Sequence, residues 1–321
     1  RIDALIDGRP VEARGVAPAA SQTGDQRHLS IPAPAHDFEL GLVARSGALA
    51  SEVARVRLVY AGAPAVEQVL KPKLYAVTIG VSDYVDPGLR LGYAADDARG
   101  FAAVLLRQKG GLYSDVQVKT LADREVTRAS VVEALDWLGE SVTARDVAMV
   151  LIAGHGVTDE KQNYWFLPAD VSMKHLSSSA VSQDDILRAM RGVYGKAILF
   201  LDTCHANQAV NAGGVAARGP VDVNSIVNEL AKTENGLIVF SSSQGRELSG
   251  ESAQFGHGNF TEALIEGLDL GKADLLHKGV ITVSGLDAWI ADRVKQLTEG
   301  HQHPVMSRPS TVPDFAFAVA R

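Results

Sequence analysis

The sequence lacks the features that mark several large classes of protein. It contains a single cysteine in 321 residues, which excludes an intrachain disulfide and a cysteine-rich zinc site. It has no uncharged apolar run of about 18 residues, the length that a membrane-spanning helix needs, and no secretory signal at its start. Its formal net charge of -7 leaves no basic surface of the kind that nucleic acid binding requires. We therefore expect a cytoplasmic protein that binds neither nucleic acid nor membrane.

The composition is that of an ordinary globular protein, with 46% apolar and 21% charged residues. The first part differs from the rest, because short alternating runs such as FELGLVARS (38–46) and VARVRLVYAG (53–62) stand between Pro, Gly and Ser. This period of two predicts antiparallel strands. We expect residues 1–63 to form a small all-β, sandwich-like appendage, the tail of a larger upstream region, and residues 64–72 to form a linker.

From Lys73 onward, buried strand patterns alternate with amphipathic helix patterns. Strands are expected at 73–84, 116–121, 146–154, 196–204, 236–243 and 313–320. Helices are expected at 93–110, 127–142, 180–192, 258–268 and 284–297, and Thr127 is the expected N-cap of the second. Such alternation is typical of an α/β domain in which helices cover both faces of a mainly parallel sheet, so the expected architecture has three layers.

Two of the predicted strands bring reactive side chains to one edge of the sheet. The strand at 146–154 leads into His155, and ILFLDTCHA places Cys204 at the end of another strand, 49 residues later. In parallel sheets, ligands bind at the carboxyl ends of the strands. A neighbouring His lowers the pKa of a thiol, and the thiolate is the nucleophile. The backbone amides of Gly156 and Cys204 are then candidates for an oxyanion hole.

The alternative is that Cys204 is a structural residue. Free cysteines are among the most buried residue types, and a lone cysteine after an apolar strand also fits a small core residue. His205 is expected to be structural or part of a loop, because adjacent side chains of a strand point to opposite sides. The presence of His155 at the end of a second strand favours catalysis over simple burial.

A series of motifs spans roughly residues 72–308. It consists of KLYAVTIGVSDY, LGYAADDARGFAAVL, VLIAGHGV, WFLPAD, ILFLDTCHA, SSSQGRELSGE, HGNFTEAL and ITVSGLDAWIADRV. The series resembles the caspase-like cysteine peptidases, and within them the prokaryotic metacaspase (orthocaspase) branch more than the animal caspases. The stretch DTCHA is similar to the metacaspase form DxCHSG, except that Ala206 replaces the Ser and no Gly follows.

The resemblance implies a caspase-like fold with three parts. These are a large portion at 73–205, a connecting segment at about 206–235 and a small portion at about 236–321. The resemblance also implies a cysteine endopeptidase in which Cys204 attacks the scissile carbonyl and His155 protonates the leaving amine.

The resemblance further implies cleavage after Arg or Lys. Asp202, Asp97 and the neighbouring Asp96 match or adjoin the acids of the family's substrate pocket, and such acids attract a guanidinium through charge and paired hydrogen bonds. The same residues also fit other roles, Asp202 as an acceptor at a strand end and the other two as acids favoured at a helix start.

No cofactor or resident metal is expected. Some metacaspases require calcium, and a calcium site here would draw on Asp83 and Asp86 together with Asp170 or Asp184, although turn and cap roles are the alternative.

His257, His301 and His303 lack a Cys or acid at metal-ligand spacing, which predicts surface or loop histidines. Trp165 is expected in the core or on the wall of a substrate cleft.

The connecting segment is the expected site of self-cleavage. Exposed segments are the usual sites of nicking, and Arg218 offers a basic residue there, with Lys232 as the second candidate.

Residues 1–63 resemble the strand-rich segment ahead of the peptidase domain in some bacterial multidomain relatives, which implies an upstream sensor domain. Two alternatives stay open: an inactive caspase-like scaffold, and a peptidase of this fold with another specificity.

Overall fold

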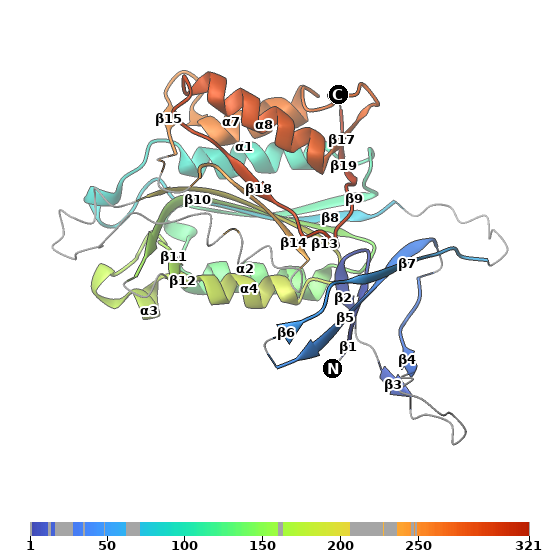
Figure 1. The fold of residues 1–321 in the computed structure, drawn as a ribbon. Helices are drawn as coiled ribbons and strands as arrows, with labels where there is room; N and C mark the ends of the chain where they lie inside the picture. Colours follow the sequence, from blue (N-terminus) through green and yellow to red (C-terminus); the bar gives the residue numbers. More distant parts are fainter. Residues whose placement is uncertain are drawn as a thin grey trace, which may run out of the picture.

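The computed structural model describes residues 2–11, 14–16, 28–34, 36–47, 49–61, 71–159, 163–205, 227, 236–244, 247 and 249–320. Within these residues the chain forms a central sheet with helices on both faces and a separate strand-rich part at the N-terminus (Figure 1). The expected α/β class, with three layers and a small all-β segment ahead of them, is confirmed. Among the described residues, no helix has both the length and the apolar character needed to cross a membrane.

The central sheet has five parallel strands. In spatial order they are β9 (Asp115–Ala122), β8 (Lys73–Gly80), β10 (Val147–Thr158), β13 (Lys196–His205) and β14 (Leu237–Ser241). Three short antiparallel strands extend it: β18 (Val305–Ser307) beside β14, and β11 (Tyr164–Phe166) followed by β12 (Val181–Ser182) beside the second half of β10. A mainly parallel sheet therefore gains antiparallel pieces at both sides.

Two groups of helices cover the sheet. On one face lie α1 (Ala94–Arg107), α7 (Asn259–Asp269) and α8 (Val283–Leu297), and on the other lie α2 (Arg128–Ser141) and α4 (Gln183–Arg191) (Figure 1). A short α3 (Leu176–Ser179) and three 3-10 turns, Pro87–Leu89, Asp123–Glu125 and Met173–His175, lie in the connections. The hydroxyl of Thr127 accepts a hydrogen bond from the backbone N–H of Ser130, which confirms the predicted N-cap of α2.

The alternation of side chains along β13 explains why both faces need helices. Leu199 and Leu201 belong to the core beneath α2 and α4, whereas Ile198 and Phe200 belong to the core beneath α1, α7 and α8. Every one of these side chains is at most 2% exposed. Because successive residues of a strand face opposite sides, position 202 continues the face of Phe200. The acid at the end of the strand is thus directed toward α1 and α7.

The N-terminal strands form a sheet of their own. It contains β1 (Ile2–Ile6), β2 (Arg9–Val11), β5 (Phe38–Ser46), β6 (Leu49–Ala50) and β7 (Ala54–Leu58), all in antiparallel pairs. Another pair, β3 (Arg14–Val16) with β4 (His28–Ser30), lies apart from it (Figure 1).

A buried arginine joins this sheet to the α/β part of the chain. Arg9 is 5% exposed, and its guanidinium donates to the Gly236 carbonyl at 2.8 Å, to the Met190 carbonyl at 3.3 Å and to the Val193 carbonyl. Burial lowers the pKa of Arg9 to about 10, so the group stays charged at neutral pH. The N-terminal sheet is therefore fixed to the end of α4 and to the residue just before β14.

Three details differ from the sequence-based expectation. The strand predicted to end at residue 154 continues to Thr158, because β11 supplies a second hydrogen-bonding partner to β10 from Gly156 onward. The last predicted strand is confirmed as β19 (Ala316–Val319), but it pairs with β17 (Val280–Thr282) in a separate ribbon. A further ribbon, β15 (Glu251–Ser252) with β16 (His257–Gly258), was not expected, since two-residue strands leave no periodic pattern.

Candidate active site

The two predicted catalytic residues lie side by side along the backbone. Strands β10 and β13 are parallel neighbours, and their register places His155 opposite Cys204 and Gly156 opposite His205. Neighbouring strands are about 4.8 Å apart, so both positions share the carboxyl edge of the sheet. Only the backbone of Cys204 and His205 is described. The roles of Cys204 as nucleophile and of the Gly156 and Cys204 amides as an oxyanion hole thus stay predictions.

His155 is held in place by groups from the loop after β8. The residue is 6% exposed, its Nε2 lies 3.0 Å from the Leu89 carbonyl oxygen, and its backbone N–H donates to the Tyr84 hydroxyl at 2.9 Å. The two rings also pack together, with centroids 5.3 Å apart. A carbonyl oxygen can only accept, so Nε2 carries the hydrogen and Nδ1 is the basic nitrogen of the neutral ring. The surroundings therefore select one tautomer of His155.

A glycine makes this arrangement possible. Gly154 has a φ of +147°, a conformation that L side chains rarely adopt. A Cβ at this position would lie 2.9 Å from the Tyr84 hydroxyl oxygen and 3.1 Å from the Phe166 ring. Only glycine thus leaves room for Tyr84 to reach the backbone of His155. The sequence-based interpretation assigned no role to Leu89 or Tyr84, because a main-chain acceptor has no side-chain signature.

An acidic pocket lies at the same edge of the sheet. Its walls include Asp97 from α1, Asp202 from β13 and Glu251 from β15, and the space between them is narrow, with a volume of about 10 Å³. A Cβ on Gly258 would lie 2.9 Å from Oδ2 of Asp202 and 3.1 Å from Oδ2 of Asp97. The two aspartates therefore converge on one point, and the structure brings together two of the three acids that the resemblance singled out.

Asp202 is held by hydroxyl groups. The Ser249 hydroxyl donates to its Oδ1 at 2.6 Å, and the Thr261 hydroxyl donates to its Oδ2 at 2.9 Å. Burial raises the pKa of Asp202, while these hydrogen bonds act in the opposite direction. The buried amide of Gln302 supports the loop from the other side, since it donates to the Ser242 carbonyl and the Ser249 hydroxyl. The orientation of this carboxylate is thus fixed on several sides.

Asp97 has a different set of partners. Its Oδ1 lies 3.0 Å from Nδ1 of His257 and accepts from the Gly258 amide at 3.0 Å. Burial raises the pKa of Asp97 to about 7, and the nearby charge of Asp202 acts in the same direction, whereas His257 and the amide lower it. The expectation of a surface or loop role for His257 is corrected here, because the side chain is half-buried against the pocket acid.

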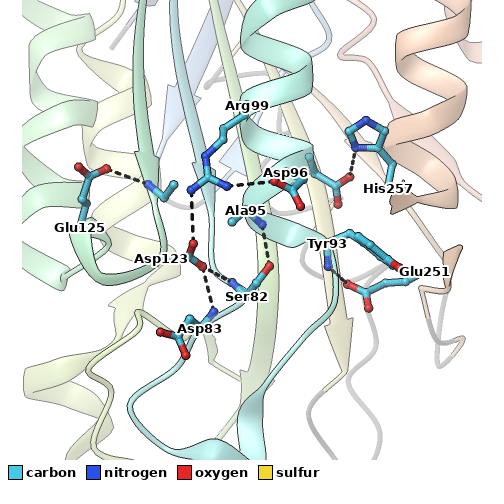
Figure 2. A network of polar contacts seen from close by, with 12 residues as sticks. Ser82, Asp83, Tyr93, Ala95, Asp96, Arg99, Asp123, Glu125, Glu251 and His257 are labelled. Carbon is cyan, nitrogen blue, oxygen red and sulfur yellow. Dashed lines mark hydrogen bonds and ion pairs between the residues drawn. The ribbon is translucent and has the colours of Figure 1, made fainter. Parts of the chain in front are cut away.

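Asp96 lies outside the pocket, although it is the immediate neighbour of Asp97. It is exposed and pairs with Arg99 at 3.0 Å, and Arg99 also contacts Asp123 (Figure 2). Asp123 accepts from the amides of Ser82 and Asp83, and the Ser82 hydroxyl accepts from the first turn of α1. This network fixes the start of α1 above the carboxyl end of β8.

The acids considered for calcium have other partners. Asp83 faces Arg90 at 3.2 Å and Arg124 at 3.3 Å, and these cations lower the pKa of Asp83. Asp86 caps the turn Pro87–Leu89 through the Gly88 amide, the cap role weighed as the alternative. Within the described ranges, no group of three His, Cys, Asp or Glu residues, Asp170 and Asp184 included, is placed to hold a metal ion.

The remaining singled-out residues either have other partners or fall outside the described residues. His301 is exposed, and His303 contacts Glu247 through both its amide and its Nδ1, each at 2.8 Å. Trp165 is half-buried on β11, packs against the core beneath α2 and α4, and donates to Asp159.

Arg218 and Lys232 fall outside the described residues, so self-cleavage there stays a prediction.

The α/β fold brings the ends of β10 and β13, with His155 and Cys204, to one edge of the sheet, and comparison with known proteins identifies the family of the chain. Residues 73–315 match the family model of the caspase domain (Peptidase_C14), so the chain belongs to the caspase-domain family of cysteine peptidases. A solved protein of Geobacter sulfurreducens is similar over 78% of this chain and 100% of that chain, with 19% identity and a TM-score of 0.54. Caspase-1 from Spodoptera frugiperda gives 74% and 87% coverage, 13% identity and a TM-score of 0.46. No match was found among the curated proteins compared.

Proposed function

We propose that this chain is a cysteine endopeptidase that cuts the peptide bond after Arg or Lys, with Cys204 as nucleophile and His155 as acid and base. The observation that carries the proposal is the burial of two carboxylates, Asp97 and Asp202, in one pocket beside the strand end of Cys204. A nearby cation stabilises the charged form of a buried carboxylate, and a basic substrate side chain supplies one.

The distance along β13 fits this assignment. Position 204 is two residues beyond Asp202 on the same strand, so it belongs to the same face of the pleat. Two residues of strand span about 7 Å, which the long side chain of Arg or Lys can bridge while its carbonyl lies at the nucleophile. An acidic side chain would meet two like charges instead.

In the proposed reaction the Cys204 thiol gives its proton to His155, and the sulfur attacks the carbonyl carbon of the scissile bond. The C–N bond then breaks, the leaving amine takes the proton from His155, and a thioester remains on the enzyme. Water attacks the thioester, the C–S bond breaks, and the thiol regains its proton. The hydrogen bond of Nε2 to the Leu89 carbonyl supports this role, because it leaves Nδ1 to exchange the proton.

Self-processing is part of the proposal. An enzyme that prefers basic residues would cut its own connecting segment at Arg218 first and at Lys232 second. Incubation of the wild type, followed by mass spectrometry of the products, tests this step. An intact chain under conditions where added peptides are cleaved would refute it.

The activity is tested with fluorogenic peptides that end in Arg, Lys or Asp. The wild type should release the fluorophore from the Arg and Lys peptides, and Cys204→Ala and His155→Ala should not. The assay is run with and without calcium, which decides whether this ion is needed. No cleavage by the wild type would favour a scaffold role, and cleavage after Asp would refute the assignment of the pocket.

A further inference from the structure

The ribbon β15–β16 holds the acidic pocket against the start of α1. Glu251 on β15 accepts from the backbone amides of Gly92 and Tyr93 at 2.9 and 3.0 Å, and His257 on β16 contacts Asp97 at 3.0 Å. Figure 2 shows the contact of Glu251 with Tyr93. The ribbon thus touches the beginning of the helix with one carboxylate and one imidazole. The first contact caps free amides, whereas the second joins two groups that can both titrate near neutral pH.

The two oxygens of Asp97 have different surroundings. Both the imidazole of His257 and the amide of Gly258 contact Oδ1, whereas Oδ2 is the oxygen that lies toward Gly258 and Asp202. His257 does not line the pocket and packs instead against Gly100 of α1, where a Cβ would be 2.8 Å from its Cε1. The imidazole therefore supports Asp97 from behind and leaves the substrate space open.

The charges around this pair are mostly negative. The charges of Glu262 on α7 and Asp96 on α1 act on His257. The charge of Asp202 on β13 acts on Asp97, and that of Glu251 on β15 acts on Asp202. Arg99 of α1 is engaged with Asp96 and Asp123. Among the described residues that line the pocket, none is Lys or Arg. Among the described residues, His257 is thus the basic side chain that contacts Asp97.

We propose that His257 is a positioning residue of the specificity pocket, whose imidazolium keeps Asp97 ionised and turned toward the substrate while the pocket is empty. The inference rests on the proposed preference for basic residues. It adds that recognition of the basic side chain depends on pH through the His257–Asp97 pair. Without the imidazolium, Asp97 retains its proton to higher pH, because desolvation and Asp202 both oppose its charge.

The first test measures kcat/KM for an Arg peptide from pH 5 to pH 9 in the wild type and in His257→Gln. Glutamine keeps a hydrogen-bond donor without the charge. We expect the acidic limb of the profile to move upward by about 1–3 pH units, mainly through KM. His303→Gln is the matched control, since that histidine also contacts a carboxylate, Glu247, outside the pocket. An unshifted limb in His257→Gln, or an equal shift in the control, would overturn the proposal.

The second test does not depend on catalysis. In the Cys204→Ala protein, calorimetry measures binding of agmatine, a guanidinium amine, and NMR follows the titration of the His257 ring with and without Asp97→Asn. We expect the ring to titrate at lower pH once Asp97 is neutral, and agmatine to bind less tightly below pH 7 in His257→Gln. An unchanged ring titration would refute the positioning role alone. Failure of the wild-type pocket to bind agmatine, with intact ring coupling, would instead refute the basic-residue preference.

Discussion

Replacement of Asp202 by Asn tests whether the buried carboxylate recognises the substrate. The change keeps the shape of the side chain, and the hydroxyls of Ser249 and Thr261 can rotate to accept from the new amide group. What disappears is one negative charge that is 5% exposed. Removal of one partner from a buried, hydrogen-bonded charge pair costs about 2–5 kcal/mol.

The lower part of that range applies here, because Asp97 remains in the pocket. We therefore expect a loss of about 2–3 kcal/mol in transition-state binding of an Arg peptide, or about 30-fold to about 150-fold in kcat/KM. The folded protein should keep its thermal stability, since burial raises the pKa of Asp202 and the charge itself opposes folding.

The assay compares Asp202→Asn with Asp96→Asn on peptides that end in Arg and in an uncharged residue. Asp96→Asn makes the same change of charge at an exposed position that pairs with Arg99. It should reduce kcat/KM less than about twofold, because exposed ion pairs contribute little. Equal losses in the two variants, or a loss in Asp202→Asn that is independent of the substrate side chain, would refute the assignment of Asp202 to the pocket.

Three further predictions concern Tyr84, Arg9 and Asp97. Tyr84→Phe removes the acceptor of the His155 amide and should lower kcat about tenfold with KM unchanged, as steady-state kinetics would show. Arg9→Met leaves three buried carbonyls without their donor and should lower the free energy of unfolding by about 3 kcal/mol in urea, while the exposed Arg55→Met changes it by less than about 1 kcal/mol. The folded pKa of Asp97, about 7, lies above its unfolded value, so folded protein retains a proton that the unfolded chain has lost. Stability should thus fall by up to about 4 kcal/mol as pH rises from about 4 to about 7, and Asp97→Asn should flatten this slope; an unchanged slope would contradict the raised pKa.

The sequence predicted the two central strands because each has a continuous apolar run, although β10 continues four residues past its expected end. Apolar runs marked β10 and β13, and the parallel sheet then required His155 and Cys204 to meet at one edge. The helix pattern could also have separated the two acids of α1. Asp97 lies three residues after Ala94 and four before Phe101, both of which are buried, whereas Asp96 has the phase of the exposed Arg99.

Other parts of the site could not be predicted, for physical reasons. The Leu89 carbonyl belongs to the main chain, and any residue type would offer the same acceptor. His257 meets Asp97 across 160 residues through a strand of two residues, which has no period to detect. The antiparallel strands β11 and β18 are three residues long, and their pairing depends on the neighbouring strand edges.

The Arg9 contact also constrains the order in which the protein assembles during synthesis. Its guanidinium donates to the carbonyl of Gly236, 227 residues farther along the chain. At about 5–20 residues per second, the ribosome needs on the order of 10–45 s to make that intervening stretch. The carbonyls of Met190 and Val193 are made before that of Gly236, so the complete set of acceptors exists only at the end of this interval. The N-terminal sheet can therefore make all of its Arg9 contacts only after the strand that carries Cys204 has been made, although its own strands are the first to be synthesised.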